Sequence, residues 1–225
     1  MTKTRTSRRA APPPRRSPAS STLILGVAGL VIAAAAVAAI LLTQSGSTPA
    51  PSFSPVASAG SATSGVVTGT ALPAYAPGAT DPAVGQPAPL VEGASFDGTP
   101  VAIKADGRPK LVLFIAHWCP HCQREVPVVQ DWLDAKGLPA GVDLVSVATG
   151  IDPTLPNYPP DAWLAREGWT PPVIVDGDRQ IATAYGLTAF PYWVAIGADG
   201  NVAGRLTGEL TPDQLDELVA SLTGG

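Results

Sequence analysis

The sequence contains few of the residues that build covalent scaffolds, metal centres or nucleic-acid sites. Its two cysteines are too few for a disulfide-rich scaffold, and its two histidines are too few for a large histidine-built metal site. Six basic residues precede position 20, and the rest of the chain carries 8 basic and 18 acidic residues, a net charge of −10. Nucleic-acid binding needs a basic face that neutralises phosphates, so we expect no nucleic-acid partner.

A long apolar run follows the basic N-terminal cluster. Residues 23–42 include no charged or polar side chain, and a helix of this length spans roughly 30 Å, the hydrocarbon thickness of a bilayer. We expect residues 1–22 to form a cytoplasmic basic tail and residues 23–42 a single transmembrane helix, which anchors the rest of the chain outside the cytoplasm. The alternative is a cleaved signal peptide, whose apolar region is usually about 7–15 residues long.

Residues 43–84 have the composition of a linker. Of these 42 residues, 33 are Ala, Ser, Thr, Pro or Gly, and Asp81 carries the only charge. Such a segment buries too little apolar surface to offset the conformational entropy that folding removes. We therefore predict a disordered linker here and a folded domain over residues 85–225.

In the predicted domain, short apolar runs alternate with turn signals. A hairpin around Asp97-Gly98 and a central strand at 111–115 precede a helix that begins near Cys119-Pro120 and ends by Gly137. Further elements are expected at residues 142–147 (strand), 161–168 (helix), 173–175 (strand), 179–186 (helix), 192–196 and 201–206 (hairpin), and after Thr211 (helix with a capping box to Gln214). This order predicts an α/β fold with one mixed central sheet and helices on both faces.

Both cysteines lie in the segment Trp118-Cys119-Pro120-His121-Cys122, where the central strand passes into a helix. The first turn of a helix brings residues three apart within the distance that a disulfide needs. Unpaired N–H groups and the positive end of the helix dipole stabilise a thiolate at Cys119, and the thiolate is the attacking form of cysteine. Cys122 lies one turn inside the helix, so we predict that Cys119 attacks and Cys122 resolves the mixed disulfide.

These residues give the chain a resemblance to the thioredoxin superfamily, specifically to its membrane-tethered TlpA/ResA-like branch. The branch pattern Trp-Cys-x-x-Cys-x-x-Glu-x-Pro is matched at every fixed position by residues 118–127, and Phe190-Pro191 precedes a strand. The resemblance covers about residues 85–225. It implies a thioredoxin-like fold and a redox-active Cys119–Cys122 pair that exchanges disulfides with client proteins outside the cytoplasmic membrane.

The resemblance also implies roles for residues around the cysteines. Glu125 lies on the helical face of Cys122 and is expected to be a partly buried carboxyl, with a raised pKa, that exchanges protons with the resolving thiol. Thioredoxins proper carry a buried acid where this chain has Leu113, which gives Glu125 more weight. Pro191 is expected to be a cis proline that faces the cysteines beside an extended client segment. The predicted substrate-binding residues are Trp118, Pro120, Phe190 and Pro191.

His121 is expected beside Cys119, as a donor that stabilises the thiolate and makes the disulfide more oxidising. The dipeptide Pro120-His121 also occurs in DsbA, a strong oxidant, whereas the TlpA/ResA-like branch is rich in reductases. The direction of electron flow therefore stays open at this point.

Other functions fit the residues less well. Two thiolates and a histidine from the group His117, Cys119, His121 and Cys122 could hold copper, which gives a copper-binding redox protein as the alternative function. Covalent haem attachment needs a histidine at position 123, where this chain has Gln123. A peroxidase needs a threonine at position 116, where this chain has Ala116. Both functions are therefore disfavoured. We predict a thiol-disulfide oxidoreductase without a metal or added cofactor, which exchanges with client proteins and with a membrane electron donor or acceptor.

Overall fold

The computed structural model describes residues 65–224, and its centre is a five-stranded mixed sheet. The strand order is β6-β5-β4-β7-β8. β4 pairs in parallel with β5 and antiparallel with β7, so the sheet is mixed as predicted. The strands are β4 (Lys110–Ile115), β5 (Asp143–Thr149), β6 (Val173–Asp176), β7 (Tyr192–Ile196) and β8 (Val202–Thr207).

Every residue of the central strand β4 is buried, as expected for an apolar strand that is covered on both faces. Leu111, Leu113 and Ile115 belong to the core below the helices on one face, while Val112 and Phe114 belong to the core on the other face. Leu113 is fully buried among apolar side chains, so the position that bears an acid in thioredoxins proper is part of the hydrophobic core here.

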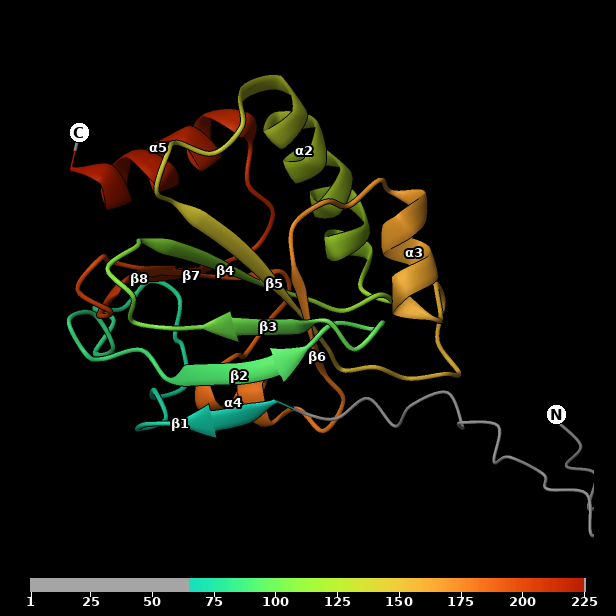
Figure 1. Ribbon diagram of the computed structural model, residues 1–225, viewed down its shortest axis with the longest axis horizontal. Coiled ribbons are helices and arrows are strands. Elements are labelled where there is room, and N and C mark those ends of the chain that lie inside the picture. Colours follow the sequence, from blue (N-terminus) through green and yellow to red (C-terminus); the bar gives the residue numbers. More distant parts are fainter. Residues whose placement is uncertain (1–64, 225) are drawn as a thin grey trace, which may run out of the picture. The chain divides into compact units, whose positions relative to one another are not determined.

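Helices cover both faces of the five-stranded sheet, which confirms the predicted layering (Figure 1). α2 (Pro120–Lys136), α3 (Pro160–Arg166) and α5 (Pro212–Thr223) contribute buried side chains to one core. α4 (Gln180–Ala184) contributes Ile181 and Ala182 to the core on the other face. The predicted capping box of α5 is present, because Thr211 and Gln214 each accept the other's backbone N–H.

The hairpin around Asp97-Gly98 forms as predicted but lies in a second sheet. β2 (Leu90–Ala94) and β3 (Pro100–Ile103) pair antiparallel with each other, and β2 also pairs with β1 (Val66–Thr68). The prediction of one sheet is therefore wrong. The reason is packing: Val91 and Ile103 point into the α4-side core, so the hairpin lies across that core instead of extending the edge of the larger sheet.

The linker prediction is wrong for residues 65–84, which pack on the domain. Leu72 and Ala83 are buried, and the Leu72 backbone N–H donates to Ala184 O at 2.8 Å. Asp81 forms an ion pair with the fully buried guanidinium of Arg205. Composition could not reveal this, because these small residues are held by backbone hydrogen bonds and one buried charge pair rather than by a large apolar face.

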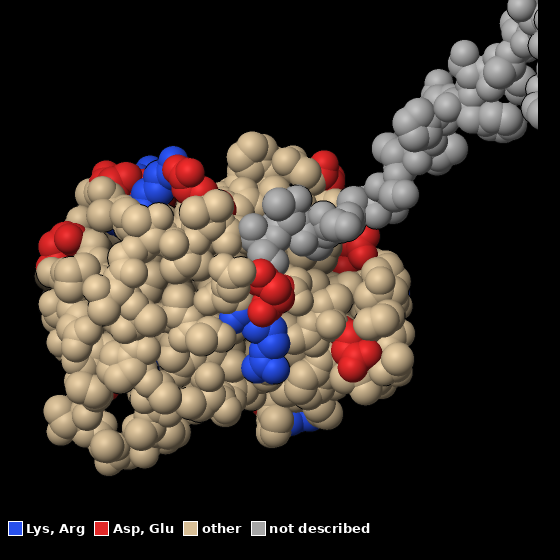
Figure 2. Space-filling model, turned by 90° about the horizontal axis from the view of Figure 1, so that it is seen from below, with Lys and Arg blue, Asp and Glu red and all other residues tan. Residues whose placement is uncertain are grey.

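The predicted tail, membrane helix and linker up to residue 64 lie outside the described residues. Within residues 65–224, no helix has both the length and the apolar character needed to cross a membrane. On the face in Figure 2, most of the described surface is uncharged, and acidic and basic side chains are scattered over it in small groups.

Candidate active site

The two cysteines lie at the start of α2, where the predicted strand-to-helix junction places them. Cys119 is the N-cap residue, with extended backbone angles, and Pro120 follows at the first helical position. No side chain caps this end of the helix, and its first turn contains no acidic residue. The positive end of the helix is therefore not neutralised by its own first turn, and a thiolate at Cys119 would meet it directly.

The two sulfurs have different surroundings. Both residues are free thiols; Cys119 keeps 6% of its surface exposed, whereas Cys122 keeps none. Burial raises the pKa of Cys122 strongly, and the charges of Cys119 and Glu125 raise it further. The backbone N–H of Ala116 lies 3.5 Å from the Cys122 sulfur and partly opposes that rise. Cys122 is therefore held as a protonated thiol behind the more accessible Cys119.

Glu125 is a buried carboxyl one turn beyond Cys122, as predicted. Its side chain is 1% exposed and accepts hydrogen bonds from Trp193 Nε1–H (3.0 Å) and from the Leu210 backbone N–H (2.9 Å). Burial raises the pKa of Glu125 to about 7, although both hydrogen bonds act to lower it. Its hydrogen-bond partners within residues 65–224 include no cation, so a proton can join or leave this carboxyl near neutral pH.

Aromatic side chains border the cysteine segment. Trp118 and Phe190 meet edge to face with ring centroids 5.8 Å apart, and Trp118 Nε1–H donates to Gly150 O at 2.7 Å. Gly150 has a positive φ of 62°, and a Cβ there would lie 3.8 Å from both rings. The Phe190–Pro191 peptide bond is cis, which agrees with the expectation for Pro191. Pro120 is exposed beside the cysteines.

His121 lies in the first turn of α2, but its contacts differ from the prediction. Its side chain is 60% exposed, and its Nδ1 lies 2.6 Å from Glu209 Oε1 and 2.9 Å from Arg124 Nη2. Arg124 donates to the same carboxylate through Nε (3.0 and 3.1 Å) and Nη2 (2.6 Å). The hydrogen bond from His121 to a Cys119 thiolate is therefore replaced by one to Glu209, which lies far away in the sequence.

The loop that joins β8 to α5 connects these parts of the site. Gly208 donates its backbone N–H to Pro191 O at 2.9 Å, and Leu210 donates to Glu125. Between them, the Glu209 carboxylate forms hydrogen bonds with the side chains of His121 and Arg124. Three consecutive residues thus link the cis proline, the exposed side of α2 and the buried carboxyl.

His117 is a structural residue in this arrangement. It is buried; its Nδ1–H donates to Pro156 O at 2.6 Å, and its Nε2 accepts from the Asp152 backbone N–H at 3.2 Å. Both ring nitrogens are thus in use. Within residues 65–224, no three or more His, Cys, Asp or Glu side chains are grouped so that they could hold a metal ion.

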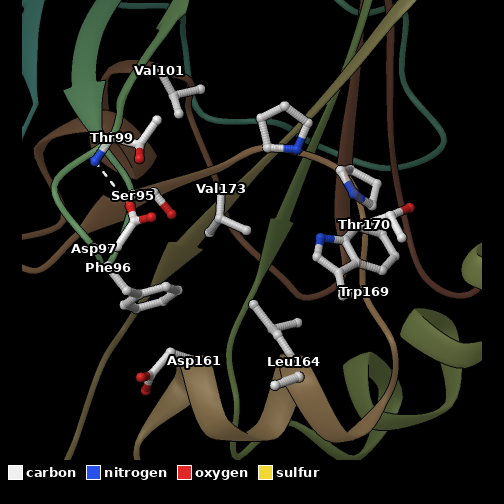
Figure 3. Close-up of a pocket in the computed structure, with 13 residues that line it drawn as sticks. Ser95, Phe96, Asp97, Thr99, Val101, Asp161, Leu164, Trp169, Thr170 and Val173 are labelled. Carbon is white, nitrogen blue, oxygen red and sulfur yellow. Dashed lines mark hydrogen bonds between the residues drawn. The ribbon is translucent and has the colours of Figure 1, made fainter.

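A cavity of about 790 Å³ lies apart from the cysteines (Figure 3). It opens between the turn of the β2–β3 hairpin and α3, and Phe96, Leu164, Trp169 and Val173 face it. None of its lining residues belongs to the cysteine segment or to the Phe190-Pro191 segment.

Comparisons with known proteins agree with this geometry. A family model described as Redoxin matches residues 83–222. The chain belongs to the Redoxin family. It is 26% identical, over 142 residues, to the thiol-disulfide oxidoreductase ResA of Bacillus thuringiensis (strain Al Hakam), a match that covers 62% of this chain and 79% of that protein. It is also 26% identical, over 134 residues, to the methylamine utilization protein MauD of Methylobacillus flagellatus, which covers 55% of this chain and 57% of that protein.

Solved structures place this Redoxin-family chain in the thioredoxin fold. The thioredoxin-family thiol:disulfide interchange protein of Chlorobium tepidum TLS aligns with a TM-score of 0.52 at 27% identity, covering 60% of this chain and 94% of that one. StoA of Bacillus subtilis aligns with a TM-score of 0.51 at 25% identity, covering 61% and 98%. The chain is therefore a TlpA/ResA-like thioredoxin-superfamily protein and an oxidoreductase of the thiol-disulfide type.

Sequence reasoning missed three residues of the Redoxin site. Trp193 is not among the predicted site residues, yet its indole N–H donates to Glu125. Strand alternation from Pro191 places residue 193 on the same side as residue 191, and this signal could have revealed it. Arg124 lies close to the cysteine segment in the sequence and carries a charge, which only weakly indicates a role in the site. Glu209 lies 85 positions beyond Arg124, and no pattern in the sequence connects the two.

Proposed function

We propose that the Cys119–Cys122 pair is the redox centre of an extracytoplasmic thiol-disulfide oxidoreductase that exchanges disulfides with client proteins. The observation that carries this proposal is the asymmetry of the two sulfurs: Cys119 is slightly exposed at an uncapped helix start, and Cys122 is fully buried. Such an arrangement separates an attacking sulfur from a resolving sulfur.

In the reductive direction, the Cys119 thiolate attacks one sulfur of a client disulfide. One client thiolate leaves, and a mixed disulfide joins Cys119 to the client. Cys122 then loses its proton and attacks the Cys119 sulfur, which releases the second client thiolate and leaves a Cys119–Cys122 disulfide. The client gains two electrons and the cysteine pair loses them. The oxidative direction is the reverse of these steps.

Glu125 supplies the proton step in this proposal. Its pKa of about 7 leaves it partly protonated at neutral pH, and its charge acts on Cys122. It can therefore take the Cys122 proton when the mixed disulfide is resolved and return it when the pair is reduced. Trp118 and Pro120 flank Cys119 in the chain, and Phe190, which precedes the cis Pro191, packs against Trp118. In this proposal these four residues contact the client segment.

Cysteine variants test the redox centre directly. With a disulfide-containing protein such as insulin as the client, we expect Cys119→Ser to abolish exchange and Cys122→Ser to accumulate a mixed disulfide that a reductant releases. These are the only cysteines of the chain, so the double serine variant is a thiol-free control. Exchange by Cys119→Ser at the wild-type rate would refute the nucleophilic role.

The proposed membrane location of the protein is based on the basic cluster before residue 20 and the apolar run at 23–42. We propose that this run anchors the protein in the cell membrane with residues 85–225 outside the cytoplasm, where a membrane electron donor or acceptor renews the cysteine pair. Protease added to intact spheroplasts should digest the C-terminal domain and spare an N-terminal fragment. Protection of the whole chain until the cells are lysed would contradict this topology.

A further inference from the structure

The exposed side of the site contains a charge cluster that the exchange steps do not use. Glu209 accepts hydrogen bonds from Arg124 Nε, Arg124 Nη2 and His121 Nδ1, all between 2.6 and 3.1 Å. Both side chains belong to the first two turns of α2, whose N-cap residue is Cys119. The carboxylate therefore holds the two groups that are best able to stabilise a thiolate at Cys119.

Glu209 has little freedom to move. The neighbouring residues are fixed by backbone hydrogen bonds, Gly208 to Pro191 O and Leu210 to the Glu125 carboxyl. Gly208 has a φ of +100°, a conformation that favours glycine. The position of the Glu209 carboxylate beside α2 is thus set by the rest of the site and not by its own side chain alone.

The remaining charged and titratable groups near Cys119 are few. α2 contributes Cys122, His121, Arg124 and the buried Glu125, and the β8–α5 loop contributes Glu209. His117, two residues before Cys119, is buried, and both of its ring nitrogens are engaged by Pro156 O and the Asp152 backbone N–H. The hydrogen bond with Glu209 is the main cause of the raised pKa of Arg124, and the proximity of Cys119 is a lesser cause in the same direction. Arg124 is bound to Glu209 and lies in the second turn of the helix whose N-cap is Cys119, so the Glu209 carboxylate and a Cys119 thiolate are two anions that can compete for one guanidinium.

We propose that Glu209 is a positioning residue that holds the Arg124 guanidinium and the His121 imidazole on its own carboxylate and thereby limits the stabilisation of the Cys119 thiolate. This inference rests on the proposed function. Reduction of the disulfide at neutral pH consumes two electrons and one proton when it leaves a Cys119 thiolate and a Cys122 thiol. A less stable thiolate makes this reduction less favourable, so Glu209 makes the pair a weaker oxidant.

The test replaces Glu209 with glutamine and measures the equilibrium with reduced and oxidised glutathione. Loss of the negative charge and release of the Arg124 guanidinium and the His121 imidazole act in the same direction. We expect Glu209→Gln to favour the reduced form about fivefold, in the range measured for exposed ion pairs, which corresponds to about 20 mV. The ultraviolet absorbance of the thiolate at neutral pH should rise in parallel.

Three further variants separate positioning from a general charge effect. Glu217→Gln removes an exposed carboxylate from the neighbouring helix α5 and should change the glutathione equilibrium less than twofold. Arg124→Gln should shift it in the direction opposite to Glu209→Gln, because it removes a cation that the thiolate could recruit. In the double variant Arg124→Gln/Glu209→Gln, the effect of the Glu209 substitution should shrink, as expected for coupled residues.

The outcomes are distinguishable from failure of the proposed function. If the wild-type pair forms no reversible disulfide with glutathione, the proposed function itself is wrong. If the wild-type pair titrates normally but Glu209→Gln leaves the equilibrium unchanged, or shifts it toward the oxidised form, the positioning role is wrong. A lower melting temperature without a shift in the equilibrium would show a merely structural role and would also overturn the inference.

Discussion

Two glutamates near the cysteine segment differ in burial, in hydrogen-bond partners and in the direction of their pKa shift. Glu125 is buried, is held by two neutral N–H donors, and has a pKa raised to about 7. Glu209 is partly exposed, is held by an arginine and a histidine, and has a lowered pKa. The comparison shows that burial without a cation raises the pKa of a carboxyl, whereas pairing with an arginine lowers it.

Asp81 combines features of both glutamates. Its side chain is largely buried, yet it is paired with the Arg205 guanidinium, and this pairing lowers its pKa despite the opposing effect of burial. Arg205 also donates to Pro73 O and Tyr185 O, so the ion pair ties residues 73–81 to strand β8. The pair is therefore a test of whether pairing outweighs burial.

The largest effect is expected from Asp81→Asn. This substitution leaves the buried Arg205 charge without its counter-ion, which should destabilise the folded chain by about 3 kcal/mol. Denaturant unfolding of the purified chain measures the change. Asp97→Asn, at an exposed hairpin turn, is the matched control and should have a much smaller effect. Equal losses of stability in the two variants would contradict the stabilising role of the buried Asp81–Arg205 ion pair.

A pH-dependent effect is expected from Glu125→Gln. Because burial raises the folded-state pKa of Glu125 from 4.5 to about 7, its contribution to stability is fully present below pH 4.5 and is lost as the pH rises through 7. The full swing is roughly 3 kcal/mol. The stability of Glu125→Gln relative to the wild type should therefore increase by this amount across that window. If the stability difference between Glu125→Gln and the wild type were independent of pH, the pKa of Glu125 would not be raised in the folded chain.

The smallest effect concerns salt. The Glu209 cluster is exposed, so about 1 M salt, with a Debye length of about 3 Å, should reduce the fivefold effect of Glu209→Gln on the glutathione equilibrium to less than twofold. The pH window of Glu125, which is buried, should shift little under the same conditions. A large salt response at Glu125 and none at Glu209 would reverse the comparison between the two sides of the site.

Much of the site could be predicted because it is local in the sequence. Cys119, Cys122 and Glu125 lie within two turns of one helix, so spacing alone places them on related faces, and Pro120 marks where that helix begins. The hairpin at Asp97-Gly98 and the capping box at Thr211 are equally local. In each case the interacting residues are neighbours along the chain, and the pattern of side chains is sufficient.

The predictions from sequence were wrong where segments that are far apart along the chain meet in the fold. The packing of residues 65–84, the second sheet and the partner of His121 depend on contacts such as Asp81 with Arg205 and His121 with Glu209, which are 124 and 88 positions apart. The sequence alone determined a strand-to-helix junction that carries two cysteines and an acid. Only the tertiary structure decided which carboxyl is buried without a cation and which is paired, because burial and charge pairing arise from side chains that the fold brings together from far along the chain.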